Sequence, residues 1–230
     1  MAEIIRVARH VPRFVNLDTA DEITAPITRQ ELEGTLKWFQ KDKSPGPDGL
    51  PIEFYLAFFE IIANDLLNVV EECRTYRRMY EAINTTFTAL ILKLDSPNSF
   101  NDFRPISLCN TIYQIIAKII ANQLRPILSH QISPEQFAFL HNRKIHEAIG
   151  TTQEAIHSIK SKALKRLILK IDLAKAFDHI SWLFIKMILI HLGFPNEFIN
   201  WIIYCINTVS YNILINDLAT HFFHANRGLR

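Results

Sequence analysis

The most constraining feature of the sequence is a short apolar run that ends in an acidic residue. Residues 167–171 read Leu-Ile-Leu-Lys-Ile, a pattern typical of a buried central β-strand rather than a helix. Asp172 follows directly, so a carboxylate is expected where the strand emerges. Such a carboxylate is costly to bury alone and is commonly held by a cation or by hydrogen bonds. The run therefore predicts either a metal-binding acid or an acid that accepts backbone hydrogen bonds in a turn.

The spacing of apolar residues predicts a mixed α/β chain around this strand. Thr28 and Glu31 form a capping-box pattern that begins a helix near Arg29, and Gly193 with Pro195 should end another. A first helix is expected from residue 29 to a point before the loop at 44–49, and another from residue 112 to Pro126, which should limit or kink it. Further helices are expected over residues 52–76, 146–160, 182–192 and 196–205. Further strands are expected over 84–93, 104–108 and 209–215, the last paired through a turn at 216–217 with a partner around 221–224. The small sheet should carry Asp172.

Length and composition indicate a globular, intracellular protein. At 230 residues and 49% hydrophobic content, the chain can bury a core as one large domain or two lobes. Cys73, Cys109 and Cys205 lie far apart, which favours a reducing compartment and argues against a zinc site or a disulfide framework. No apolar run approaches the roughly 20 residues that span a bilayer, and the N-terminus lacks the apolar segment of a signal peptide. Membrane association is therefore not expected.

The distribution of charge leaves two interpretations open. The net charge of +2 is compatible with a nucleic-acid partner but does not indicate one by itself. Two basic clusters comprise Arg74, Arg77 and Arg78, and Lys160, Lys162, Lys165 and Arg166. Clusters of this kind are usually solvated helix ends, and contact with phosphate groups is the alternative.

Five further segments combine with residues 170–178 into a recognisable series. They are residues 43–49 (KSPGPDG), 90–93 (LILK), 102–108 (DFRPISL), 132–139 (ISPEQFAF) and 227–230 (RGLR). In that order and approximate spacing, the series resembles the reverse transcriptase domain of non-LTR (LINE-type) retrotransposons. The resemblance runs from about residue 27 to the last residue. It implies a right-hand polymerase fold, with an N-terminal extension at 1–26, a fingers region at 27–165 and an incomplete palm at 166–230.

The resemblance also implies RNA-directed DNA polymerisation, with an RNA template, a DNA primer, dNTPs and Mg²⁺. Asp172 matches a catalytic aspartate of the palm that binds the metal, and the carbonyl of Leu173 matches a second ligand; hard oxygen ligands suit Mg²⁺. Phe177 matches an aromatic residue that packs under the incoming sugar and excludes a 2'-hydroxyl. Asp178 is interpreted as structural, at the start of the helix that contains Trp182.

Four other residues match binding positions of the family. Lys93 and Arg104 resemble a clamp on the incoming triphosphate, because an ammonium group and a guanidinium fork both suit phosphate oxygens. Gln136 and Arg143 match a segment that lies along the template, and residues 44–49 resemble a fingers loop. Without the series, each of these residues would be interpreted as an ordinary surface or turn residue.

Several departures from the family pattern limit what the resemblance implies. Leu92 stands where the family usually has Pro, and His141-Asn142 where it has Pro-Gly. The last motif breaks off after Arg230, so the paired aspartates of the palm hairpin and the thumb are expected to be missing from this chain. An isolated chain should therefore be inactive, and the rival interpretation is a non-catalytic nucleic-acid-binding remnant or a translated pseudogene. A metal-dependent hydrolase built on Asp172 lacks a second acid cluster or histidine ligands. The location should be nuclear if the chain behaves like its parent element.

Overall fold

The computed structural model describes residues 6, 8, 10–76, 78–138, 140, 143–216 and 218–229. The chain divides into two units, which we call the body (residues 1–121 and 177–230) and the 122–176 unit. These boundaries differ from those of the fingers and palm, and that division stays a prediction. Some positions singled out in the sequence lie outside the described residues: Arg77, Phe139, His141, Asn142, Asp217 and Arg230. Among the described residues, no helix has the length and apolar character needed to cross a membrane.

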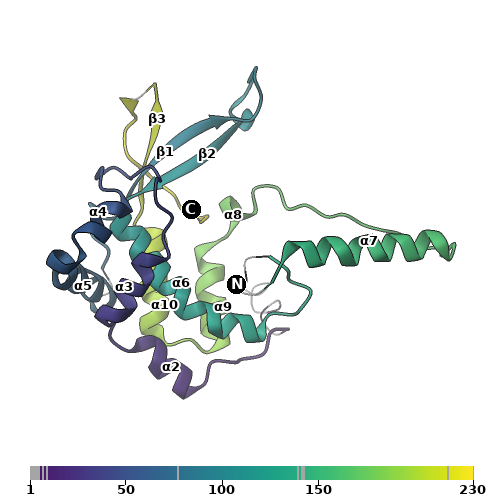
Figure 1. Ribbon diagram of the computed structural model, residues 1–230, viewed down its shortest axis with the longest axis horizontal. Helices are drawn as coiled ribbons and strands as arrows, with labels where there is room; N and C mark the ends of the chain where they lie inside the picture. Colours follow the sequence, from purple (N-terminus) through teal and green to yellow (C-terminus); the bar gives the residue numbers. More distant parts are fainter. Residues whose placement is uncertain are drawn as a thin grey trace. The chain divides into compact units, whose positions relative to one another are not determined.

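A small sheet forms one layer of the body (Figure 1). Its strands are β1 (Thr85–Leu92), β2 (Phe103–Cys109), β3 (Ser210–Ile215), β4 (Leu218–Ala219) and β5 (Phe223–His224). The order is β2-β1-β3-β4, with β5 also paired to β3. β1 and β2 form an antiparallel hairpin, whereas β1 and β3 are parallel. The predicted strands at 84–93, 104–108 and 209–215 are therefore confirmed, and they lie in one sheet.

Helices make up most of the rest of the body. They are α2 (Leu17–Thr24), α3 (Arg29–Lys37), α4 (Ile52–Ala57), α5 (Phe59–Thr75), the first part of α6 (Thr111–Gln131), α9 (Trp182–Leu192) and α10 (Asn196–Asn207). Thr28 caps α3 as its spacing predicts, since its hydroxyl accepts a hydrogen bond of 3.1 Å from the Glu31 N–H. Gly193 ends α9 with φ of 96°, a conformation that favours glycine.

Two helices differ from their predicted limits. The helix expected over 52–76 is broken at Phe58, which has φ of −103° and ψ of 13° and separates α4 from α5. Helix α6 continues through Pro126 to Gln131, so a limit at the proline is wrong and the alternative of a kink stays a prediction. Proline lacks the N–H needed for one helical hydrogen bond, but it can still be accommodated within a long helix at a cost in stability.

The core of the body is formed by the buried faces of α3, α5, α6 and α10. Ile115, Ile116 and Ile119 on α6 are completely buried, and Trp201 on α10 is 1% exposed. Burying one such aliphatic side chain contributes about 1.5–3 kcal/mol. This core stabilises the helical layer that supports the sheet.

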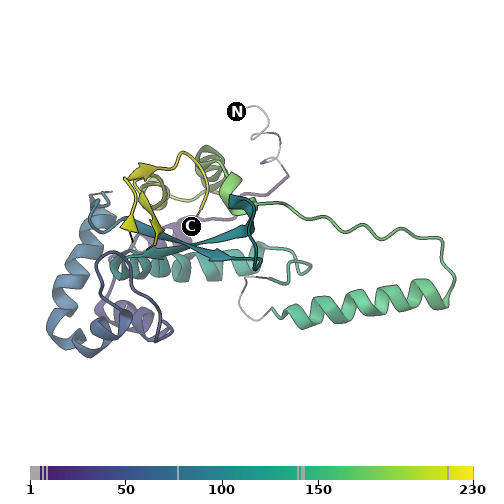
Figure 2. The ribbon, with the colours of Figure 1, turned by 90° about the horizontal axis from the view of Figure 1, so that it is seen from above.

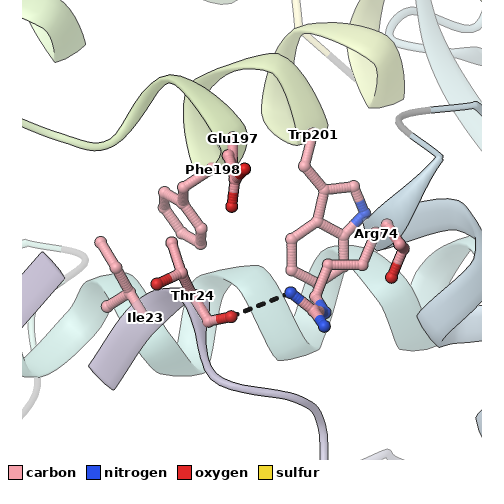
Figure 3. A pocket seen from close by; sticks show the side chains of 7 residues that line it. Ile23, Thr24, Arg74, Glu197, Phe198 and Trp201 are labelled. Atoms are coloured by element: carbon pink, nitrogen blue, oxygen red, sulfur yellow. Dashed lines mark hydrogen bonds between the residues drawn. The ribbon is translucent and has the colours of Figure 1, made fainter. Parts of the chain in front are cut away.

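Arg74 connects α5 to the end of α2 beside a cavity that α10 also lines (Figure 3). Its guanidinium donates a hydrogen bond of 2.9 Å to the Thr24 carbonyl at the end of α2 and a bidentate pair, at 2.7 and 2.9 Å, to Glu71. The hydrogen bond to Glu71 is the main reason that the Arg74 pKa is raised. Arg74 and Trp201 both line a cavity of about 240 Å³. Because Arg74 already donates to these internal acceptors, we interpret it as a structural connection.

The 122–176 unit has a different character. Its helix α7 (Ile145–Ser161) matches the helix predicted over 146–160. No residue that the structure describes between 122 and 176 is buried. After α7 the chain runs extended and unpaired, as Figure 2 illustrates. The apolar residues of this stretch are exposed, Leu167 by 88% and Ile171 by 74%.

The prediction of a central strand leading to Asp172 is wrong for this structure. Residues 164–173 have no regular secondary structure in the described chain, and the interior strands of the sheet are β1 and β3. The physical reason is pairing: an apolar run becomes a strand only when a neighbouring backbone takes up its hydrogen bonds. Both edges of β1 are already occupied, by β2 and by β3. The small sheet therefore does not carry Asp172.

A second correction concerns Asp178. It lies in the short helix α8 (Ala176–His179) and not in the helix that contains Trp182. Helix α9 begins separately after Ser181. Asp178 therefore lies in the first turn of α8, where an acidic side chain favours the positive end of a helix.

Candidate nucleotide and nucleic-acid site

Phe177 is held by the C-terminal segment of the body. The Leu229 N–H donates a hydrogen bond of 2.9 Å to the Phe177 carbonyl, and the Gly228 N–H donates one of 2.8 Å to the Ile180 carbonyl. The indole N–H of Trp182 donates to the Gly228 carbonyl at 2.7 Å. These bonds join residues about fifty positions apart, so the final motif fixes the backbone that carries the Phe177 ring.

Gly228 is required for this close approach. Its φ of 91° lies in a region that residues with a side chain rarely adopt. A Cβ atom at this position would lie 3.0 Å from the Asp178 carbonyl oxygen and 3.2 Å from its Cα. The roles of Gly228 and Trp182 were not predicted, although a lone glycine in the final motif was a signal that the backbone there needs unusual freedom.

A cavity of about 670 Å³ lies between this segment and the sheet. Strand β1 contributes Thr88, β2 contributes residues 105–107, and Tyr211 of β3 stacks on Phe223 of β5 with ring centroids 5.7 Å apart. Phe177 lines the same cavity, and the residue is 58% exposed. Arg227 adds a cationic side chain to the lining. An exposed aromatic ring beside a cation can contact a sugar and a phosphate group together.

Lys93 and Arg104 lie on the β1–β2 hairpin. The register pairs Arg104 with Ile91, so alternation along the strands places Arg104 and Lys93 on one face of the hairpin. The Lys93 ammonium donates a hydrogen bond of 2.7 Å to the Asn101 carbonyl. Arg104 is exposed, and its side chain forms no ion pair or hydrogen bond within the described chain. The structure thus brings these two predicted residues together, and the cavity that Phe177 lines does not include them.

The turn of this hairpin is organised by Asp102. Its carboxylate accepts hydrogen bonds of 2.9 Å from the backbone N–H groups of Asn98 and Ser99. These bonds, that from Asn98 foremost, lower the pKa of Asp102 below its ordinary value of 3.8. The bonds close the loop between the two strands and so fix the spacing of Lys93 and Arg104.

Asp172 and Leu173 lie in the exposed extended stretch of the 122–176 unit. The Asp172 carboxylate and the Leu173 carbonyl are hard oxygen donors, which suit a divalent cation. Among the residues that the structure describes, however, no group of three or more His, Cys, Asp or Glu side chains is gathered where it could hold a metal ion. Asp172 and Leu173 would therefore supply two of the roughly six ligands that Mg²⁺ takes.

Arg143 closes the loop that follows α6. Its guanidinium donates hydrogen bonds of 2.7 Å to the carbonyls of Ile132 and Gln136, and it also contacts the Ser133 carbonyl. Gln136 is exposed, and its side-chain amide donates to the Ala138 carbonyl at 3.3 Å. The structure brings Gln136 and Arg143 together, with the Arg143 charge directed to its own loop.

The comparison with known proteins decides the family. Residues 91–230 match the family described as reverse transcriptase (RNA-dependent DNA polymerase). This chain belongs to that family. The match covers Lys93, Arg104, Asp172, Phe177 and the C-terminal segment. The family generally uses divalent metal ions, and in general its members act on an RNA template with nucleotide substrates.

Two curated relatives agree with the LINE-type resemblance. The chain is 27% identical over 210 residues to an uncharacterized 149 kDa protein of transposon TX1 from Xenopus laevis, an alignment that covers 91% of this chain. It is 25% identical over 204 residues to the retrovirus-related Pol polyprotein from type-1 retrotransposable element R1 of Bradysia coprophila, which covers 86% of the chain. The chain spans only 16% and 18% of the lengths of these relatives. It is thus a reverse transcriptase domain of LINE type that corresponds to a small part of the proteins it resembles.

Proposed function

We propose that this chain supplies the fingers and the first part of the palm for RNA-directed DNA synthesis by a LINE-type reverse transcriptase. The observation that carries the proposal is the family match over 91–230, because that range includes both cations of the hairpin, strand β2 and every lining residue of the Phe177 cavity except Thr88. The substrates in this proposal are a dNTP, an RNA template and a DNA primer.

The nucleotide-binding roles rest on side-chain chemistry. Lys93 and Arg104 share a face of the hairpin and would bind the triphosphate, Arg104 through two parallel hydrogen bonds. Phe177 presents an exposed ring that offers no hydrogen bond to a 2'-hydroxyl, so it would favour a deoxyribose. Gln136 and Arg143 are proposed to lie along the template, with the backbone of their loop as the contacting surface.

The metal in this proposal is Mg²⁺, bound in part by Asp172 and Leu173. When bound, such an ion stabilises negative charge that develops on the phosphate oxygens. The contribution of this chain is to offer a carboxylate that is exposed and free of hydrogen bonds within the described residues. Purified chain is expected not to extend a primer, since two oxygen ligands hold a divalent ion poorly. Extension that depends on Mg²⁺ and is lost in Asp172→Ala would contradict that expectation.

The proposal is tested by titrating the chain with dUTP and UTP, which differ only in the 2'-hydroxyl, with Mg²⁺ present. Calorimetry should give tighter binding of dUTP. Arg104→Ala should weaken both nucleotides by about tenfold or more, since a hydrogen bond to a charged group contributes about 1.5–3 kcal/mol. Phe177→Ala should bring the two affinities together. The matched control is Lys186→Ala, which removes an exposed cation of α9. The assignment of Arg104 and Phe177 would be refuted if dUTP and UTP bound with equal affinity and if that affinity were the same in the parent chain and in all variants.

A further inference from the structure

A second cavity of the body lies against the start of the 44–49 loop, the segment that resembles a fingers loop, and its other lining residues have no role in the proposed function. It has a volume of about 340 Å³ and lies where the end of α3, the loop over 43–52 and the start of α6 meet. Its lining includes Trp38, Lys43, Gln114 and Lys118. We call it the Trp38 cavity. The residues proposed to bind the incoming nucleotide and the metal do not line this cavity, and neither do Gln136 and Arg143, which are proposed to lie along the template.

The loop that forms one wall is fixed in place. A Cβ atom on Gly46 would lie 2.4 Å from the backbone nitrogen of Asn110, so the loop backbone touches the end of β2 directly. The side-chain carbonyl of Asn110 accepts a hydrogen bond of 3.0 Å from the Asp48 N–H. The Thr111 hydroxyl donates one of 2.6 Å to the Leu50 carbonyl. Because these contacts hold the loop to the start of α6, the cavity is preformed.

Trp38 is unusually exposed for its type. The residue is 62% exposed, whereas tryptophan is on average among the more deeply buried residues. Its ring makes no ring contact within the described residues. The backbone N–H of Trp38 is bonded to the Thr35 carbonyl at 3.2 Å, so the residue itself is held at the end of α3. The exposed indole therefore offers a flat surface on an anchored stretch of backbone at the edge of the cavity.

The charge of the cavity complements this surface. Lys43 comes from the loop and Lys118 from α6, and neither forms an ion pair within the part of the chain that the structure describes. No aspartate or glutamate is among the lining residues. Lysine without a counterion attracts phosphate, and an aromatic ring stacks on a nucleobase because every base has a π-face. The two features together fit a nucleotide unit, whereas an acidic peptide would leave the ring without a partner.

We infer that the Trp38 cavity binds one unpaired nucleotide of a single-stranded nucleic acid, with its base on Trp38 and its phosphate between Lys43 and Lys118. The volume is at the small end of ligand pockets, about 300–1,000 Å³, which suits a single nucleotide. The inference rests on the proposed function for its choice of nucleic acid. It adds to that function a contact with an unpaired stretch of strand.

The stacking part is tested with a fluorescein-labelled oligouridylate of about twelve nucleotides, within the usual range of single-strand sites. An abasic oligomer of equal length serves as the matched ligand. Trp38→Ala should weaken oligouridylate binding by about 5- to 150-fold, the range for loss of one stacked base, and should leave the abasic oligomer unaffected. Trp38→Phe should keep most of the affinity. Tyr76→Ala is the matched protein control, since Tyr76 is 74% exposed and does not line the cavity.

The phosphate part is tested by salt dependence. Lys43→Gln and Lys118→Gln should each reduce the slope of log affinity against log salt concentration by about 0.7, the value for one phosphate contact on a single strand. Lys186→Gln should leave the slope unchanged, because Lys186 is exposed on α9 away from the cavity. Circular dichroism of each variant checks that the fold is kept.

The outcomes separate this inference from the proposed function. The stacking site is refuted if the parent chain binds the abasic oligomer as tightly as oligouridylate. It is also refuted if Trp38→Ala binds each oligomer with the same affinity as the parent chain. Absence of binding at low salt refutes it as well. The dUTP titration with Arg104→Ala and Phe177→Ala stands independently of these results, because neither residue lines the Trp38 cavity.

Discussion

The body and the 122–176 unit are built from similar residues but use them differently. In the body, apolar faces of helices meet, and side chains such as Ile115, Ile116 and Trp201 are almost completely buried. In the 122–176 unit, Ile145 is 61% exposed and Leu169 73% exposed. Both regions have the periodic patterns that predict helices and strands. The difference teaches that a correct local pattern produces a packed element only where another element covers its apolar side.

The two regions also differ in charge. The 122–176 unit holds nine of the 25 Lys and Arg residues but four of the 23 Asp and Glu residues, a net charge of +5. The remaining residues, those of the body, therefore carry a net charge of −3. The nearly neutral total conceals this separation. A region with few buried contacts and a strong positive charge is suited to bind a polyanion at its surface.

The largest effect is expected from a matched pair of isoleucine substitutions, one in the body and one in the 122–176 unit. Ile119→Ala removes a completely buried side chain of α6 and should lower the free energy of unfolding by about 2–5 kcal/mol. Ile149→Ala removes a side chain of α7 that is 48% exposed and should change it by less than about 0.5 kcal/mol. Urea denaturation of both variants measures the difference. A loss of similar size for Ile149→Ala would mean that α7 is packed in solution, and the contrast between the regions would fail.

A pair of glycines gives the next largest effect. Gly228→Ala places a Cβ against Asp178 at a positive φ and should destabilise the body by about 1–3 kcal/mol. Gly150→Ala lies within α7, where an added Cβ meets no atom within 4 Å. It should stabilise that helix by about 0.5–1 kcal/mol, as alanine has the higher helix propensity. Thermal denaturation followed by circular dichroism should show opposite signs for the two variants, and equal signs would contradict the structure.

Charge removal sharpens the electrostatic contrast. Changing Lys162 and Lys165 to glutamine should reduce the salt slope of RNA binding by about 0.7 for each residue that contacts a phosphate. Changing Lys41 and Lys186 of the body to glutamine should have a smaller effect, because the body is net acidic. Fluorescence anisotropy at several salt concentrations measures both slopes. Equal reductions would show that the charge separation does not direct binding.

The smallest expected effect concerns the hairpin turn, the part of the body most like the exposed unit. Residues 91–100 are all exposed, and Asp102 orders the turn through its bonds to Asn98 and Ser99. Because the pKa of Asp102 is lower in the folded turn than its ordinary 3.8, its stabilising contribution is present above that value. The contribution is lost as the pH falls through the lowered pKa. An NMR titration should follow this loss, and Asp102→Asn should remove the pH dependence of the Asn98 and Ser99 amide signals.

Local signals predicted much of the fold. The capping pair of Thr28 and Glu31 and the glycine at Gly193 placed helix limits correctly, since both depend on neighbouring residues. The unpaired stretch over 167–171 could not be predicted, because strand formation depends on which backbones are available far along the chain. The break at Phe58 likewise has no proline or glycine to signal it.

The candidate site was predictable to a different degree. The register shows that Lys93 and Arg104 share a face, but the site roles themselves stay predictions drawn from the resemblance. Trp38 was missed, because an exposed tryptophan and a core tryptophan look alike in a single sequence. The lone glycine of the final motif signals unusual backbone freedom at Gly228, but no local pattern reveals its contact with Asp178, fifty residues earlier.

The parallel pairing of β1 with β3 has a consequence for how the chain folds. The register joins Thr85 to Ser210, which emerges from the ribosome 125 residues later. The β1–β2 hairpin is complete at Cys109, 101 residues before Ser210, so at about 5–20 residues per second it waits about 5–20 s before its partner exists. During that interval one edge of β1 exposes unpaired backbone groups, and such edges are prone to pair with other chains. Nascent chains stalled before Ser210 should therefore depend on chaperones more than the completed chain does.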